Sequence, residues 1–272
     1  MTRTNLQIDR IEGDVMSVNS YVVHGPTGIV VIDGQLTISD ADKVRAAVDA
    51  TCAPLVGVLV THAHPDHYAG LAQLLGGADV PIVATEHVTA AIRRDDEVKN
   101  GIVGPMMGAE WPAQRIFPNR TPDAGSTIEL GGVEFRVIEL GPGESPADTI
   151  WLVDDTTVFA GDVAYHDAHS YLADGHADEW LANLSRLEAE LAPDAMLYVG
   201  HGEPAGKQLL ASQRAYVEAF IAAIDEYADV DDDTRQAGVV ARMVQQLPSD
   251  RLRFLMELSV APFAASRSKL RQ

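Results

Sequence analysis

The sequence predicts an α/β protein. Three features support this class: short β-branched runs joined by Gly/Pro turns, helical periodicity between these runs, and a helix-only pattern after Gly206. The chain has 272 residues, of which 46% are hydrophobic, enough for a sizeable core. We expect one α/β domain over residues 1–206 and a C-terminal helical extension over residues 207–272 that packs on it.

The beginning of the chain predicts a hairpin followed by a helix. Residues 21–24 and 29–32 are apolar runs on either side of a Gly/Pro turn, which is typical of two paired strands. A helix is expected over residues 40–50, with Ser39 or Asp40 as its N-cap.

The next expected strand is buried on both faces. Residues 56–60 are apolar without polar alternation, as in the interior strands of α/β sheets. A short helix over residues 67–75 and a strand over residues 81–84 follow. The stretch 101–125 is interpreted either as a long functional loop or as a few helical turns packed on the core.

The second half of the chain again runs from strands to helices. The expected strands are residues 128–130, 133–138, 149–153, 157–160 and 195–199, and the expected helices are residues 178–191, 207–229, 233–246 and 249–259. The three last helices form the extension, which either roofs a pocket or mediates a homodimer.

The charge of the chain argues against two classes of partner. There are 40 Asp and Glu residues against 20 Lys and Arg residues, a formal net charge of −20. Such a surface repels nucleic acid and anionic membranes, so a small-molecule substrate is the expected partner. The single cysteine, the polar N-terminus and the lack of a long apolar run in the sequence favour a cytoplasmic protein.

Four potential metal ligands directly follow the buried strand. Residues 61–67 read Thr-His-Ala-His-Pro-Asp-His. In an extended segment alternate side chains point the same way, so His62 and His64 can reach one metal together. Asp66 and His67 lie where the chain enters a helix and can face the other side. Imidazole combined with carboxylate suits zinc, iron or manganese.

This motif, T-H-x-H-x-D-H after an apolar strand, resembles the signature of the metallo-β-lactamase superfamily. The resemblance covers roughly residues 10–205. Residues 30–34 look like its early strand ending in Asp-Gly, residues 159–162 like the strand whose aspartate bridges two metals, and residues 198–202 like the strand with the last histidine. The resemblance implies an αββα sandwich with the metals at one edge of the two sheets.

One segment departs from the family pattern. Relatives place a histidine in a Gly-His-Thr/Ser-Pro-Gly segment, whereas this chain has Gly143-Glu144-Ser145-Pro146. A carboxylate can also bind these metals, so we predict that Glu144 replaces the imidazole and favours harder cations. The alternative is that Glu144 faces solvent and the site is incomplete.

The resemblance then implies two divalent ions, with zinc expected and iron or manganese as alternatives. The implied ligands form two groups and a bridge: His62, His64 and Glu144 on one metal; Asp66, His67 and His201 on the other; and Asp162 between them.

The expected function is a binuclear metal-dependent hydrolase. A metal-bound hydroxide would attack an ester, lactone, thioester or amide of a small, fairly apolar substrate, and Asp66 would orient the water or pass its proton to the leaving group. Met106, Met107 and Trp111 either wall the substrate or belong to the core. The alternatives are an iron-dependent oxidoreductase or dioxygenase of the same superfamily, and a metal-binding protein without catalysis.

Several residues after Asp162 either contact substrate or only support the fold. They are Tyr165, His166, His169, Tyr171 and His176.

Overall fold

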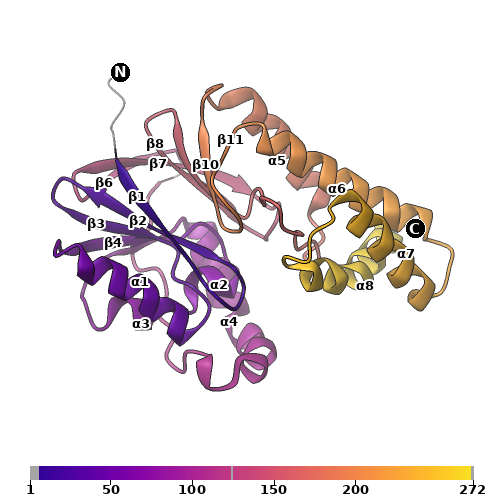
Figure 1. Ribbon diagram of the computed structural model, residues 1–272, viewed down its shortest axis with the longest axis horizontal. Coiled ribbons are helices and arrows are strands. Elements are labelled where there is room, and N and C mark those ends of the chain that lie inside the picture. Colours follow the sequence, from indigo (N-terminus) through magenta and orange to yellow (C-terminus); the bar gives the residue numbers. More distant parts are fainter. Residues whose placement is uncertain (1–5, 124, 271–272) are drawn as a thin grey trace.

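Two β-sheets pack face to face in the computed structural model, which describes residues 6–123 and 125–270 (Figure 1). The first sheet has the strand order β1-β2-β3-β4-β5 and the second β11-β10-β9-β8-β7-β6. The first contains β1 (Gln7–Glu12), β2 (Asn19–Gly25), β3 (Gly28–Ile32), β4 (Leu55–Leu59) and β5 (Ile82–Val83). The second contains β6 (Thr127–Leu130), β7 (Val133–Gly141), β8 (Asp148–Val153), β9 (Thr157–Gly161), β10 (Met196–Val199) and β11 (Ala205–Gly206).

Helices cover the outer face of each sheet, so the αββα sandwich is confirmed (Figure 1). The helices before β6 are α1 (Ile38–Ala50), α2 (Pro65–Tyr68), α3 (Leu71–Leu75), α4 (Glu86–Met107) and the 3₁₀ turn η1 (Gly108–Glu110). Those after β9 are α5 (Ala177–Glu190), α6 (Leu209–Glu226), α7 (Asp232–Gln246) and α8 (Arg253–Leu270).

The buried strands have no polar side because both of their faces are covered. Val30 of β3 packs between the sheets against a cluster that includes Phe135 and Trp151. Its neighbour Val31 points the other way, into the cluster beneath α1 and α3. Alternate side chains of such a strand point into two different apolar layers, so its sequence does not alternate between apolar and polar residues.

The C-terminal helices share a core with the second sheet. Trp180 of α5, Phe220 of α6 and Phe263 of α8 belong to one buried cluster with residues of β8, β9 and β10. The rings of Phe220 and Phe263 lie 5.2 Å apart, edge to face. These helices and the second sheet thus share one hydrophobic core, while the division of the chain into a domain and an extension at residue 206 stays a prediction.

The interpretation of residues 101–125 as one long loop is wrong for its first part. Helix α4 continues to Met107 although it contains Pro105, and η1 follows it. Gly104 allows the side chain of Trp111 to pack closely against α4, because a Cβ at position 104 would lie only 3.2 Å from Trp111. Packing of this kind overrides weak helix propensity, and the alternative of helical turns holds here.

Side chains of this segment divide between core and surface. Met107 and Trp111 pack against Leu36 and Ala69, so they belong to the core. Met106, by contrast, is 61% exposed on α4.

Other elements also differ from those expected from the sequence. Strand β1 was not predicted, because its sequence is mostly polar. Its antiparallel pairing with β2 holds it in the sheet. Helix α1 begins earlier than expected, since Thr37 is the N-cap and its hydroxyl accepts a hydrogen bond from the backbone N–H of Asp40 at 3.2 Å. Helix α8 extends beyond residue 259 to Leu270 despite Pro262.

Across the two described ranges, we find no helix with the length and apolar character needed to span a membrane.

The shared core predicts a difference between two phenylalanines. Phe220 is fully buried, so Phe220→Ala should lower the free energy of unfolding by about 3–5 kcal/mol. Phe254, which is 41% exposed, is the matched control, and Phe254→Ala should change it by less than about 1 kcal/mol. Urea unfolding followed by circular dichroism measures both values. Equal effects of the two substitutions would contradict the packing described here.

Candidate metal centre

All seven side chains predicted as ligands converge at one edge of the sandwich. They extend from the segment after β4, the β7–β8 loop, and the residues after β9 and β10. They form two groups, within each of which the potential ligand atoms lie within 4.8 Å of one another. The groups are His62, His64 and Glu144, and Asp66, His67, Asp162 and His201.

The first group is buried around the carboxylate of Glu144. Oε2 of Glu144 lies 2.9 Å from Nδ1 of His64 and 3.5 Å from Nε2 of His62. The residue is 1% exposed, so the solvent-facing alternative is wrong. The loop that carries it is held by Asp148, which accepts hydrogen bonds from the backbone N–H groups of Glu144 and Ser145 at 2.6 and 3.1 Å.

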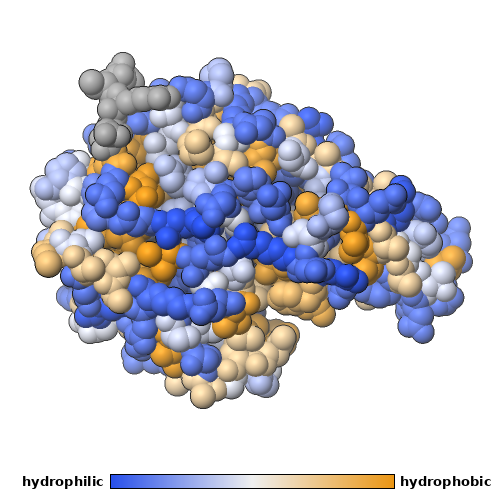
Figure 2. Space-filling model, viewed as in Figure 1, coloured by the Kyte–Doolittle hydropathy of each residue, from blue (hydrophilic) through white to orange (hydrophobic). Residues whose placement is uncertain are grey.

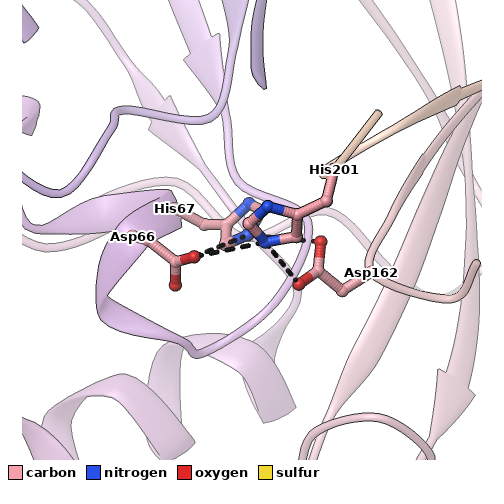
Figure 3. A group of neighbouring side chains, drawn as sticks. All are labelled: Asp66, His67, Asp162 and His201. Carbon is pink, nitrogen blue, oxygen red and sulfur yellow. Dashed lines mark ion pairs between the residues drawn. The ribbon is translucent and has the colours of Figure 1, made fainter. Parts of the chain in front are cut away.

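The second group places two imidazoles between two carboxylates (Figure 3). Nε2 of His201 lies 3.1 Å from Asp162 and 3.4 Å from Asp66. Nε2 of His67 lies 3.4 Å from Asp162 and 3.7 Å from Asp66. Gly200 leaves room for this arrangement, because a Cβ at that position would collide with Asp162.

Five ligand atoms of the two groups are buried without a hydrogen-bond partner among the described residues. They are Nε2 of His62, His67 and His201, Oε2 of Glu144 and Oδ1 of Asp162. Buried polar atoms are nearly always hydrogen-bonded, because an unpaired one costs about 1–3 kcal/mol. Nitrogen and carboxylate donors that point at common centres fit divalent cations.

Asp33 orients two of these imidazoles. Its carboxylate accepts hydrogen bonds from the backbone N–H and hydroxyl of Thr61, both at 2.8 Å, and lies 2.8 Å from Nδ1 of His67. The Thr61 hydroxyl in turn lies 3.0 Å from Nδ1 of His62. Both histidines are thus engaged through Nδ1, which leaves Nε2 for a metal. The sequence signal for this role was the Asp-Gly that ends β3.

His64 is held differently. Its Nε2 lies 3.1 Å from Oδ2 of Asp174, while Nδ1 faces Glu144. The ring of Tyr171 lies 5.3 Å from that of His64, edge to face. Carboxylate partners on the outer nitrogen fix the orientation of metal-binding histidines, and Asp174 was missed because no local motif marks it.

Tyr165 links the two groups. Its hydroxyl lies 2.7 Å from Oδ2 of Asp162 and 2.9 Å from Oε1 of Glu144, and it can donate a hydrogen bond to one of them at a time. Its ring stacks on His201 with centroids 5.1 Å apart.

The other residues singled out after Asp162 lie around the site in varied ways. His169 is buried against Tyr216 and the carbonyl of Ser249, so it supports the fold. His166 contacts the carbonyl of Glu203, and His176 is the N-cap residue of α5.

The first strands also hold the last ligand in place. The side-chain amide of Asn19 donates to the carbonyls of Val199 and Gly202 at 2.9 and 2.7 Å, and the hydroxyl of Tyr21 donates to Val199 at 2.6 Å. Val18 forms a β-bridge with His201 itself. The two sheets are therefore joined beside the metal centre.

The carboxylates strongly affect protonation of the histidines. Burial lowers the pKa of His64, but the charge of Glu144 and the hydrogen bonds to Asp174 and Glu144 together outweigh it and raise the pKa to about 10. Burial likewise opposes the charge of Asp162 at His201, whose pKa rises to about 10. Without cations, the site therefore balances its negative charge with protons.

Comparison with known proteins agrees with this geometry. A family model described as the metallo-beta-lactamase superfamily matches residues 13–201. The chain belongs to the metallo-β-lactamase superfamily. Its fold and the two groups of ligand atoms imply that it binds divalent metal ions.

Individual proteins that the chain resembles show the extent of the likeness. Hydroxyacylglutathione hydrolase from Alkalilimnicola ehrlichii is 31% identical over 162 residues, 60% of this chain and 53% of that protein. The metallo-beta-lactamase family protein TTHA1429 from Thermus thermophilus has a TM-score of 0.71 at 18% identity and covers 97% of this chain and 94% of its own. TTHA1623 in a di-iron-bound form has a TM-score of 0.60 at 25% identity over 76% of this chain and 99% of its own. The aligned part spans about half the length of the first curated relatives.

The raised histidine pKa values predict a pH dependence that metals abolish. In the metal-free protein, His64 and His201 stabilise the fold fully below their ordinary pKa of 6.5, and this stability is lost as pH rises toward about 10. Metal ligation needs neutral imidazole, so the loaded protein should lack this loss.

Urea midpoints at about pH 7 and about pH 9, compared between chelated and zinc-loaded protein, measure this difference. Groups outside the centre titrate equally in both forms and cancel. Parallel pH profiles of the two forms would contradict the prediction.

Proposed function

We propose that the chain is a binuclear metal-dependent hydrolase. The observation that carries the proposal is the set of five buried ligand atoms, in two adjacent groups, that lack a hydrogen-bond partner among the described residues. His62, His64 and Glu144 would hold one cation; Asp66, His67 and His201 would hold the other; and Asp162 would bridge them. Two bound divalent cations lower the pKa of a shared water and polarise the substrate's carbonyl oxygen.

Asp66 is the residue suited to accept the proton of the attacking water and pass it to the leaving group. Burial raises its pKa, but the charges of His67 and His201 outweigh that effect and keep the pKa below its ordinary value. An ionised carboxylate accepts a hydrogen bond from the attacking water and can return the proton to the leaving group.

Glu144 and Tyr165 shape the charge of the site. Glu144 adds a negative charge where the family usually has a neutral ring, which weakens the Lewis acidity of a neighbouring cation. The Tyr165 hydroxyl offsets part of that charge by donating toward Glu144 or Asp162. The phenol stays protonated, because burial and Asp162 raise its pKa well above the ordinary value.

The proposed substrate is small and fairly apolar, with an ester, lactone, thioester or amide bond. Hydroxyacylglutathione hydrolase, which this chain resembles, is by its name a hydrolase. The exposed apolar residues Val98, Ile102 and Met106 recur at four-residue intervals on α4. Residues at that spacing form one helix face, which suits an apolar substrate.

A second candidate is an iron-dependent redox enzyme. The similar protein TTHA1623 was solved with two iron ions, and the oxygen ligand Glu144 suits iron as well as zinc. Metal analysis of protein purified without added metal decides between them. A colourless protein that contains only zinc excludes this candidate.

The ligand role of Glu144 predicts a change in metal content. Glu144→Ala should reduce bound zinc from two equivalents to one, because His62 and His64 alone give too few ligands for a stable site. Glu144→His should keep both equivalents, since it restores the usual imidazole. The control Glu190→Ala removes a half-exposed carboxylate of α5 and should change nothing. Full zinc content in the Glu144→Ala protein would exclude this ligand.

The proposed chemistry predicts loss of hydrolysis in Asp66→Asn. Chromogenic ester, lactone, thioester and β-lactam substrates should identify an activity whose kcat falls about 10²–10⁴-fold in this variant. Metal content is measured in parallel, because Asp66 is also a proposed ligand. Asp155→Asn, in the exposed β8–β9 turn, is the control and should keep full activity. Unchanged activity in Asp66→Asn would refute the mechanism.

A further inference from the structure

Lys99 reaches from α4 to the metal-ligand segment. Its Nζ donates a hydrogen bond to the carbonyl of Ala63 at 3.0 Å. Ala63 lies between His62 and His64, so the ammonium lies beside the first group of ligands. Neither composition nor any local motif marks this lysine, because its position results from the packing of α4.

The ammonium has unused hydrogen-bonding capacity. A lysine offers three N–H donors, and only the bond to Ala63 is found among the described residues. Within the same part of the chain, no carboxylate oxygen lies within 4.0 Å of Nζ. Burial lowers the pKa of Lys99, whereas the carboxylates of Asp174, Asp95, Glu144 and Asp66 partly oppose this. An anion bound at Nζ would add to that opposition and favour the ammonium.

Apolar side chains continue from Lys99 along the helix. Ile102 and Met106 follow at i+3 and i+7, which places them on the same face as Lys99. Both are 61% exposed. In the space-filling view the surface is indented between the end of α4 and the C-terminal helices, and hydrophobic residues border this indentation (Figure 2). One cation beside an apolar face is suited to an amphiphilic ligand.

We propose that Lys99 binds a carboxylate of the substrate while its apolar part lies along Ile102 and Met106. This inference rests on the proposed hydrolase function and specifies its substrate class: a small acyl compound with one negative charge and an apolar chain. A single ammonium matches a single charge. Asp174, which is partly exposed next to His64, and the net charge of −20 disfavour polyanions.

The competing explanation is that Lys99 only tethers α4 to Ala63. Lys207 supplies a matched control, because its Nζ also donates to a main-chain carbonyl, that of Leu191, at 2.5 Å. That contact lies away from the metal centre. A tether would affect all substrates alike, whereas a binding residue would affect only those with the anionic group.

The kinetic test compares two esters on zinc-loaded protein: neutral 4-nitrophenyl hexanoate and mono-4-nitrophenyl adipate, which ends in a carboxylate. Lys99→Met should raise KM for the adipate ester about tenfold and leave KM for the hexanoate ester within about twofold, with kcat unchanged. Lys99→Arg should restore much of the loss, and Lys207→Met should resemble the parent protein. Equal losses on both esters, or none, would overturn the proposal.

Calorimetric binding of hexanoate separates this inference from the hydrolase proposal. The zinc-loaded parent protein should bind hexanoate about tenfold more tightly than Lys99→Met. If this difference is found but neither ester is hydrolysed, the anion site stands and the hydrolase proposal fails. If both esters are hydrolysed while Lys99→Met binds hexanoate equally well, the hydrolase stands and the anion site fails.

Discussion

The interaction on which the metal centre depends is the set of hydrogen bonds around the carboxylate of Asp33. It joins the end of β3 to the segment after β4, the neighbouring parallel strand. It fixes Thr61 and His67 directly, and His62 through the Thr61 hydroxyl. The residue adopts a φ of 61°, a left-handed conformation that non-glycine residues rarely occupy. The orientation of both rings therefore follows from how two adjacent strands end.

Charge balance is the second constraint on the site. Asp33, Asp66, Glu144 and Asp162 are all buried within a few ångström of the imidazoles. Burying unpaired charge is costly, so this many carboxylates can be retained only if protons or cations neutralise them. The substitution of glutamate for the usual histidine makes the requirement for positive charge stronger. The acidic composition of the whole chain agrees with a site built to hold cations.

The sequence allowed the sandwich and the convergence of the seven candidate ligand side chains to be predicted, because these depend on short motifs at the ends of apolar strands. The supporting residues were not predictable in the same way. Asp174 and Lys99 reach the site only through the packing of a loop and of α4, and no spacing rule connects them to His64. Tyr165 was noted for its position, but its contact with two carboxylates depends on tertiary geometry. The full length of α4 could not be predicted from the sequence, because Gly104 and Pro105 have weak helix propensity. Packing outweighs this propensity in the structure.

The contacts of Asn19 and Tyr21 with the strand end before His201 have a consequence for folding order. These partners are separated by about 180 positions in the chain, so the contact forms only after both sheets have come together. A ribosome-bound chain that has not yet released residue 201 cannot complete the centre, whatever the availability of metal in the cell. Cation binding is therefore a property of the finished tertiary structure. Until that structure has formed, the acidic ligand residues of the nascent chain remain without a bound cation.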